Sequence, residues 1–260
     1  MRQLLVVFAL VCFLTSALCV GQDTKPAPGT AVSQDTTQTQ NTPQTAKPAD
    51  TRASEDTKAS GRVEEAGTVV DEIQAAPDQR IPEEILGSAE CVAVVPSLLN
   101  GGFVFGGRYG KGVASCRTPK GWSAPAFFVI GGGSFGLQIG GQATDVVMLI
   151  MNKDGMNNLL SSQFKLGADA SAAAGPVGRH AAADTDWKMR AQVLTYSRSR
   201  GLFAGLELNG AVIKQDKEST REFYGHMVPF RTALKGDIDA PKDAYPFLNT
   251  LAKWAQAAAK

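Results

Sequence analysis

A glycine-rich stretch at residues 129–142, VIGGGSFGLQIGGQ, matches the spacing of two catalytic motifs. One set of its glycines fits the G-x-G-x-x-G turn that binds a dinucleotide. A second set, centred on Ser134, fits the G-x-S-x-G turn that presents the nucleophile of a hydrolase. The first motif would indicate an oxidoreductase and the second a serine hydrolase, so the residues around the glycines must decide.

Both motifs require a helix directly after the glycines. Here the following residues, FGLQIGG, alternate as a strand does, so we expect no nucleotide site. A hydrolase would also need an acid and then a histidine later in the chain, and Asp145 or Asp154 followed by His180 or His226 satisfies that order. We expect the glycines at 131–133 to form a turn, and a serine hydrolase using Ser134 is the third of three functional hypotheses.

Basic and aromatic residues gather in a part of the chain that has no acidic residue. The whole chain has 26 basic and 25 acidic residues, so only a local charge could attract an anionic partner. No Asp or Glu occurs between positions 91 and 144, and four cations and two aromatic residues lie close together there: Arg108, Tyr109, Lys111, Arg117, Lys120 and Trp122. Cations beside Tyr and Trp are typical of an anionic membrane surface. The alternative is that they are turn residues facing water.

The elements that must position these residues are mainly strands. Glycine-rich, β-branched segments recur from position 91 onward, and regular intervening helices are absent from the pattern. We therefore expect one α+β domain over 60–260, with a mainly antiparallel sheet that is open or barrel-like and is flanked by short helices. Helices are expected at 62–76, 82–89, 155–164 (with Asp154 as its cap), 218–224 and 246–259, and strands within 91–115, 126–150, 192–199 and 202–213.

The N-terminal residues predict export. Residues 1–21 combine Arg2, an apolar run and small residues, which is typical of a signal peptide, and Cys19 is a second possibility as a lipid-anchor site. Residues 22–59 lack aromatic side chains and are expected to be a disordered linker. Outside the cytosol, Cys91 and Cys116 would form a disulfide between strands or remain two buried thiols. The two histidines and these cysteines do not have the spacing of a zinc site, so no metal or cofactor is expected.

Several ordered segments resemble one known family, the SYLF domain. They are AECVAVVPSLLNGGFVFGGRYGKGVASCR, GWSAPAFFVIGGGSFGLQIGGQATDVVMLIMN, LGADASAAAGPVG and YSRSRGLFAGLELNGAVIKQD, followed by FYG at 223–225. The resemblance runs from about position 84 to 225. It implies that the glycines around Ser134 belong to a structural signature and that the domain is not an enzyme.

The resemblance also implies binding of phospholipids through basic residues. Some fungal members of the family bind actin and carry an SH3 domain, but an exported chain without an SH3 region would not be expected to share those functions. Our leading hypothesis is therefore a non-enzymatic module of the bacterial cell envelope that binds anionic phospholipids and no nucleic acid. The second hypothesis is a structural or adaptor protein whose basic face binds an acidic protein partner.

Overall fold

A computed structural model describes residues 51–76, 80–102, 105–135, 142–161, 163–177, 191–199, 202–204 and 208–257. The expected signal peptide, residues 1–21, and linker residues 22–50 lie outside these ranges. The same holds for Cys19 and His180. The domain boundaries expected there remain predictions.

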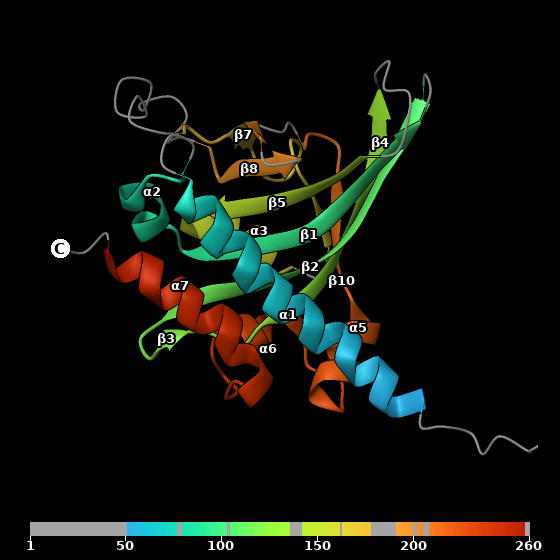
Figure 1. Cartoon of the computed structure of the whole chain (residues 1–260), viewed down its shortest axis with the longest axis vertical. Helices are drawn as coiled ribbons and strands as arrows, with labels where there is room; N and C mark the ends of the chain where they lie inside the picture. Colours follow the sequence, from blue (N-terminus) through green and yellow to red (C-terminus); the bar gives the residue numbers. More distant parts are fainter. Residues whose placement is uncertain are drawn as a thin grey trace, which may run out of the picture. The chain divides into compact units, whose positions relative to one another are not determined.

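A curled, half-barrel sheet is the centre of the described structure (Figure 1). Its strands follow the order β6-β10-β4-β2-β1-β5-β8-β7, with β3 beside β2 and β9 beside β8. Neighbours are antiparallel except β7 and β8, which are parallel. The strands are β1 (Cys91–Gly102), β2 (Phe105–Thr118), β3 (Gly121–Trp122), β4 (Ala126–Phe135), β5 (Gln142–Ile150), β6 (Gln163–Lys165), β7 (Ala172–Ala174), β8 (Val193–Ser199), β9 (Leu202–Ala204) and β10 (Val212–Gln215). The expected α+β class is confirmed.

Helices cover both faces of the sheet. They are α1 (Thr51–Ala75), α2 (Glu83–Ser88), α3 (Lys153–Leu159), α5 (Lys217–Tyr224), α6 (Phe230–Leu234) and α7 (Tyr245–Ala257), with a 3-10 turn, η2, at Lys242–Ala244. One face packs against α1, α2 and α7, and the other packs against α3 and α6 (Figure 1). We call them the α1 face and the α3 face.

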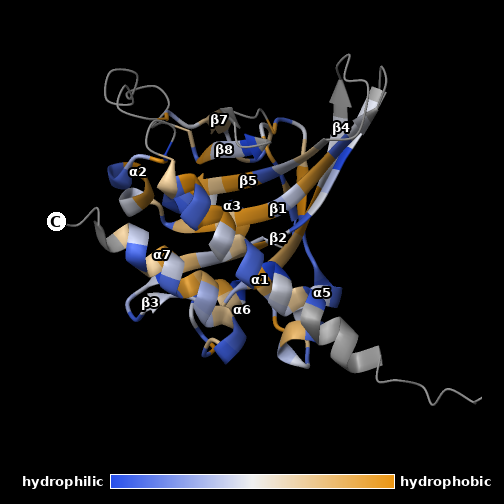
Figure 2. Ribbon diagram, in the orientation of Figure 1, coloured by the Kyte–Doolittle hydropathy of each residue, from blue (hydrophilic) through white to orange (hydrophobic). Residues whose placement is uncertain are grey.

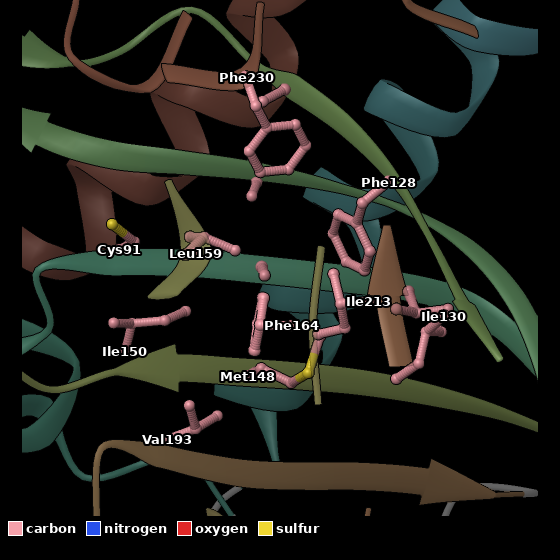
Figure 3. Close-up of a cluster of buried hydrophobic side chains, with 14 of the residues drawn as sticks. Cys91, Phe128, Ile130, Met148, Ile150, Leu159, Phe164, Val193, Ile213 and Phe230 are labelled. Atoms are coloured by element: carbon pink, nitrogen blue, oxygen red, sulfur yellow. The ribbon is translucent and has the colours of Figure 1, made fainter. Parts of the chain in front are cut away.

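Each face has its own hydrophobic core, because successive side chains of a strand point to opposite sides. Phe127 faces the α1 side and packs with Val63 and Val70 of α1. Phe128, the next residue, belongs to the α3 core with Met148 (Figure 3). The α1 stripe that the sequence predicted is completely buried.

Helix α1 begins at Thr51, within the segment 22–59 that the sequence predicted to be a linker, and the boundaries of that linker remain a prediction. The helix makes a tertiary contact at Ala59. Ala59 is buried, and its backbone N–H donates to Glu222 Oε1 at 2.9 Å. Further along α1, Asp71 accepts from the indole of Trp254 at 2.7 Å and from Lys253 Nζ at 2.9 Å, so α7 is joined to α1 by polar contacts.

Two local expectations were wrong. Residues 131–133 form the interior of β4 and not a turn. A Cβ on Gly132 would lie 3.1 Å from Ala211 Cα, so glycine lets β4 approach the chain before β10 closely. Helix α3 is capped by Asn152 and not by Asp154: the Asn152 side chain accepts from Gly155 N–H at 2.8 Å. The helix therefore starts earlier than expected and ends at Leu159.

Strand β1 contains a bulge that reverses its alternation. Its pairing with β2 shifts by one residue between Val94 and Leu99, and its pairing with β5 shifts between Val95 and Leu98. Ser97 adopts a left-handed φ of 58° there, and its N–H donates to Asp145 Oδ1 at 3.0 Å. As a result Leu98 is buried, whereas Leu99 lies on the α1 face beyond the helices.

A disulfide joins the first residue of β1 to β2. Cys91 and Cys116 are direct partners in the strand pairing, and their sulfurs are bonded. Of the two alternatives for these cysteines, the structure thus has the disulfide. Both residues are completely buried in the α3 core.

Candidate functional site

The six residues singled out for membrane binding lie on β2, on β3 and on the turn between them. Arg108 points to the α3 face, whereas Tyr109, Lys111 and Arg117 point to the α1 face, as alternation along β2 requires. Arg108 and Thr118 are ten residues apart on this strand, which corresponds to about 33 Å. The structure therefore does not bring the six residues together into one patch.

Lys111 is engaged by acidic residues from another part of the chain. Its Nζ lies 3.2 Å from Asp216 Oδ2 and 3.2 Å from Glu218 Oε2. Burial acts to lower the pKa of Lys111, but these two carboxylates outweigh it and raise the pKa above its usual value. The charge of Lys111 is thus compensated within the molecule.

Asp216 is the N-cap of α5 and is almost fully buried. Its Oδ1 accepts from Ser219 N–H at 3.1 Å and its Oδ2 accepts from Ser219 Oγ at 2.8 Å. Burial acts to raise the pKa of Asp216, yet the hydrogen bonds from Ser219 and the charge of Lys111 hold it below its usual value. Arg62 of α1 donates to Ser219 Oγ at 2.9 Å, so one network connects α1, β2 and α5.

Arg117 serves as a C-terminal cap for α2. Its guanidinium donates to the carbonyl of Ala89 at 2.8 Å and to that of Gly87 at 3.0 Å. It also lies over the ring of Trp122, 4.8 Å from the centroid. These contacts explain both residues without a ligand, and Trp122 packs against the α1 core. Lys120, in the turn before β3, has an exposed side chain.

Arg108 and Tyr109 lie at the opposite end of β2, where β1, β2 and β4 extend past the helices (Figure 1). Tyr109 is 52% exposed and its cross-strand partner Leu99 is 56% exposed. With the exposed Ala143 of β5 and the backbone of Gly101 and Gly107, they line a shallow hollow. We call this set, Leu99, Gly101, Gly107, Tyr109 and Ala143, the outer surface.

The colouring of the sheet separates this end from the rest. In Figure 2 the strands are orange beneath the helices and pale to blue toward the outer ends of β1 and β2. The pale colour reflects glycine, which supplies neither charge nor a large side chain. Sequence reasoning found Arg108 and Tyr109 here but missed Leu99 and Ala143. Without the bulge, nothing distinguished Leu99 from the buried Leu98.

The glycine motif does not have the geometry of a nucleophile elbow. Ser134 lies within β4, paired with Gly106 of β2, and not on a sharp turn between a strand and a helix. Asp145, the acid that would follow it, is bound by Arg198 and by the N–H of Ser97. His226 is exposed after α5.

Neither a metal-binding cluster nor a membrane-spanning helix is present among the described residues. They contain no cluster of three or more His, Cys, Asp or Glu side chains placed to hold a metal ion. None of the described helices has the length and apolar character needed to span a membrane.

Comparison with known proteins identifies relatives. A family model described as "Ysc84: Las17-binding protein actin regulator" matches residues 131–254. LAS seventeen-binding protein 3 of Saccharomyces cerevisiae is 36% identical over 180 residues, which are 67% of this chain and 39% of that protein. SH3 domain-containing YSC84-like protein 1 of Rattus norvegicus is 35% identical over 180 residues, 67% of this chain and 52% of that protein.

A third relative, SH3 domain-containing protein PJ696.02 of Schizosaccharomyces pombe, is 34% identical over 175 residues, 66% of this chain and 40% of that protein. The chain thus spans about half or less of the length of these curated relatives. The names of two of these relatives mention an SH3 domain, and the name of the third describes a binding protein. None of the three names is that of an enzyme. The match over these ordered segments agrees with the resemblance found in the sequence, and the chain belongs to the SYLF family, whose model carries the name Ysc84.

Proposed function

We propose that this chain is a non-enzymatic module of the bacterial cell envelope, exported by its N-terminal segment, that binds anionic phospholipids. The observation that supports this most is the outer end of the sheet. Tyr109 is half exposed there beside Arg108, in a run of 54 residues, 91–144, without a carboxylate side chain. Interfacial tyrosine and a nearby cation are the features of a surface that meets lipid headgroups.

The structure changes which cations are expected to contribute to lipid binding. Lys111 and Arg117 are bound by carboxylates and carbonyls of the same chain. The cations proposed to contact headgroups are the exposed Lys120 and Arg108, which lies next to the half-exposed Tyr109. Each basic residue near an anionic surface contributes about 1 kcal/mol. Removing both charges should therefore lower the partition coefficient about 30-fold at low salt.

Flotation of the full chain with neutral and anionic vesicles, at low and high salt, tests the proposal. The test variant combines Arg108→Gln and Lys120→Gln. The matched control combines Arg221→Gln and Lys153→Gln, which likewise remove one arginine and one lysine; both lie exposed, on α5 and α3. We expect binding that requires anionic lipid, weakens with salt and falls only in the test variant. A folded chain that floats with neither kind of vesicle would overturn the proposal.

A second function is favoured by the names of the relatives. LAS seventeen-binding protein 3 is named for a protein partner. An adaptor whose cations bind an acidic protein is the alternative for this chain, and retention of a protein partner without any lipid binding would support it.

A further inference from the structure

The outer surface exposes apolar side chains from strands whose other large apolar residues are buried. Leu99 and Tyr109 face each other across β1 and β2 and are 56% and 52% exposed. Along the same face toward α1, Val92, Val94 and Val113 are completely buried. The change occurs where the strands pass the edge of the helices, so the outer surface is a continuation of the α1 core that no described helix covers.

The backbone around the outer surface is already paired with neighbouring strands. β1 pairs with β2 as far as Gly102 opposite Gly106, and with β5 as far as Asn100 opposite Gln142. β2 pairs with β4 as far as Phe105 opposite Phe135. Peptide groups that are paired in this way can leave water without a large desolvation penalty, which unpaired groups could not.

Strands β1, β2 and β4, which extend to this end of the sheet, contain no Asp or Glu. The connecting segments 103–104 and 136–141 have the sequences FV and GLQIGG, which contain no ionisable side chain. The nearest acid on β5 is Asp145, two positions from Ala143, and it is bound by Arg198, which also pairs with Glu72. Arg108 is the cation nearest to the outer surface in β2.

The side chains of Arg108 and Tyr109 leave opposite faces of β2, because they are consecutive in a strand. One flat surface can contact both only if it meets the strands at their ends. Leu99 lies three residues before Gly102, which ends β1, and these three residues span about 10 Å. That length matches the depth of about 5 to 10 Å at which interfacial side chains are buried in a bilayer.

We infer that this protein inserts the outer ends of β1 and β2 into a lipid bilayer, with Leu99 and Tyr109 as apolar anchors and Arg108 at the headgroups. This inference rests on the proposed function and adds an orientation and an apolar contribution to it. The contribution of Leu99 and Tyr109 does not depend on ionic strength, since neither side chain is charged. Binding should therefore have a salt-resistant part.

Vesicle flotation of the full chain measures the apolar contribution. The vesicles are phosphatidylcholine with about one third phosphatidylglycerol, at high salt. Leu99→Ser and Tyr109→Ser should each lower the partition coefficient about tenfold. The matched controls, Val177→Ser and Tyr245→Ser, remove an aliphatic residue 40% exposed and a tyrosine 50% exposed, and should leave binding unchanged.

Fluorescence quenching by lipids brominated in the acyl chains reports on one position at a time. In Tyr109→Trp, the fluorescence of the introduced tryptophan should be strongly quenched by these lipids. In Tyr245→Trp, it should not be. The three natural tryptophans and the apolar N-terminal run are the same in both proteins, so the difference belongs to the new side chain.

The outcomes separate this inference from the proposed function. Selective loss in Leu99→Ser and Tyr109→Ser, with quenching at position 109, supports the insertion. Vesicle binding that depends on Arg108 and Lys120, with no quenching at 109 beyond that at 245, overturns the insertion and leaves the proposed function standing. Failure of the folded wild-type chain to bind any vesicle overturns both.

Discussion

The two ends of the β1–β2 pair use similar residues for different purposes. At the inner end, Arg117 caps α2, its partner Trp122 packs on the α1 core, and a disulfide joins the strands. At the outer end, Tyr109 and Leu99 are half exposed, and glycines occupy positions 101, 102, 106 and 107 beyond them.

This difference shows that a cation's role depends on what covers its strand. Under the helices, a basic side chain meets carbonyls and carboxylates of the same molecule and becomes part of the fold. Beyond them, the large apolar side chains Leu99 and Tyr109 are half exposed. Substitutions at the inner end should therefore change stability, and those at the outer end should change binding.

Loss of the disulfide should have the largest effect on stability. The bond closes a loop with a sequence separation of 25, so its removal should lower the free energy of unfolding by about 3 kcal/mol. Chemical denaturation with and without reductant measures this. Cys91→Ala combined with Cys116→Ala should match the reduced protein, and a reduced protein as stable as the oxidised one would contradict the expectation.

The next largest loss of stability should follow from substitution of a tightly packed glycine. A Cβ on Gly112 would lie 2.5 Å from the Val94 carbonyl oxygen and 2.5 Å from the Phe128 ring, so Gly112→Ala should destabilise the protein by about 2 kcal/mol. A Cβ on Gly133, near the outer end, meets no atom within 4 Å. Gly133→Ala is thus the control, and thermal unfolding of both variants makes the comparison. Equal losses would show that strand position does not matter.

Substitutions of Arg117 and Lys120 should differ in their effect on stability, although only two residues separate the two positions. Arg117→Met keeps the apolar stem but leaves the carbonyls of Gly87 and Ala89 without this donor, at a cost of about 1 to 2 kcal/mol. Lys120→Met should change stability by less than about 0.5 kcal/mol. If denaturation midpoints of the two variants coincide, the capping role assigned to Arg117 is wrong.

The smallest effect should be a change in acid stability. The lowered pKa of Asp216 contributes stability above the unfolded-state pKa of about 4, and that contribution is lost as the pH falls through the folded-state value. Asp216→Asn keeps an N-capping side chain but removes the charge that faces Lys111. We expect a loss of about 1 kcal/mol at neutral pH that shrinks as the pH falls below the unfolded-state pKa.

Denaturation at several pH values tests this, with the exposed Asp239→Asn as the control. A loss for Asp216→Asn that stays constant with pH would show that its cause is not the charge.

Much of the sheet and of α1 was predictable because the signal is periodic and local. The buried stripe Val63, Ala66, Val70 and Ile73 follows from helical spacing, and the strands follow from alternation. The roles of Lys111 and Arg117 were not predictable. Their partners come from Asp216 and from α2, and sequence distance does not reveal such contacts.

The exposure of Leu99 was hidden for a related reason. It depends on one extra residue in β1, and neither the composition nor the alternation of the sequence predicts such a bulge. Of the six residues predicted to bind lipid, Arg108 and Tyr109 lie next to Leu99 at this end of the sheet, and their role in binding remains a prediction.

The bulge at Ser97 determines which face of the sheet each later residue of β1 occupies. On the outer side of the bulge, adding or removing two residues from a strand would keep each side chain on its present face, whereas adding or removing one would exchange the faces. Deleting Ser97 would remove the extra residue and restore regular pairing of β1, so Leu98 and Leu99 would keep their present faces. If the unaltered sequence paired without the bulge, Leu98 would turn to the α1 face and Leu99 to the α3 face. The left-handed conformation that Asp145 holds at Ser97 therefore decides which of two adjacent leucines the molecule presents to its surroundings.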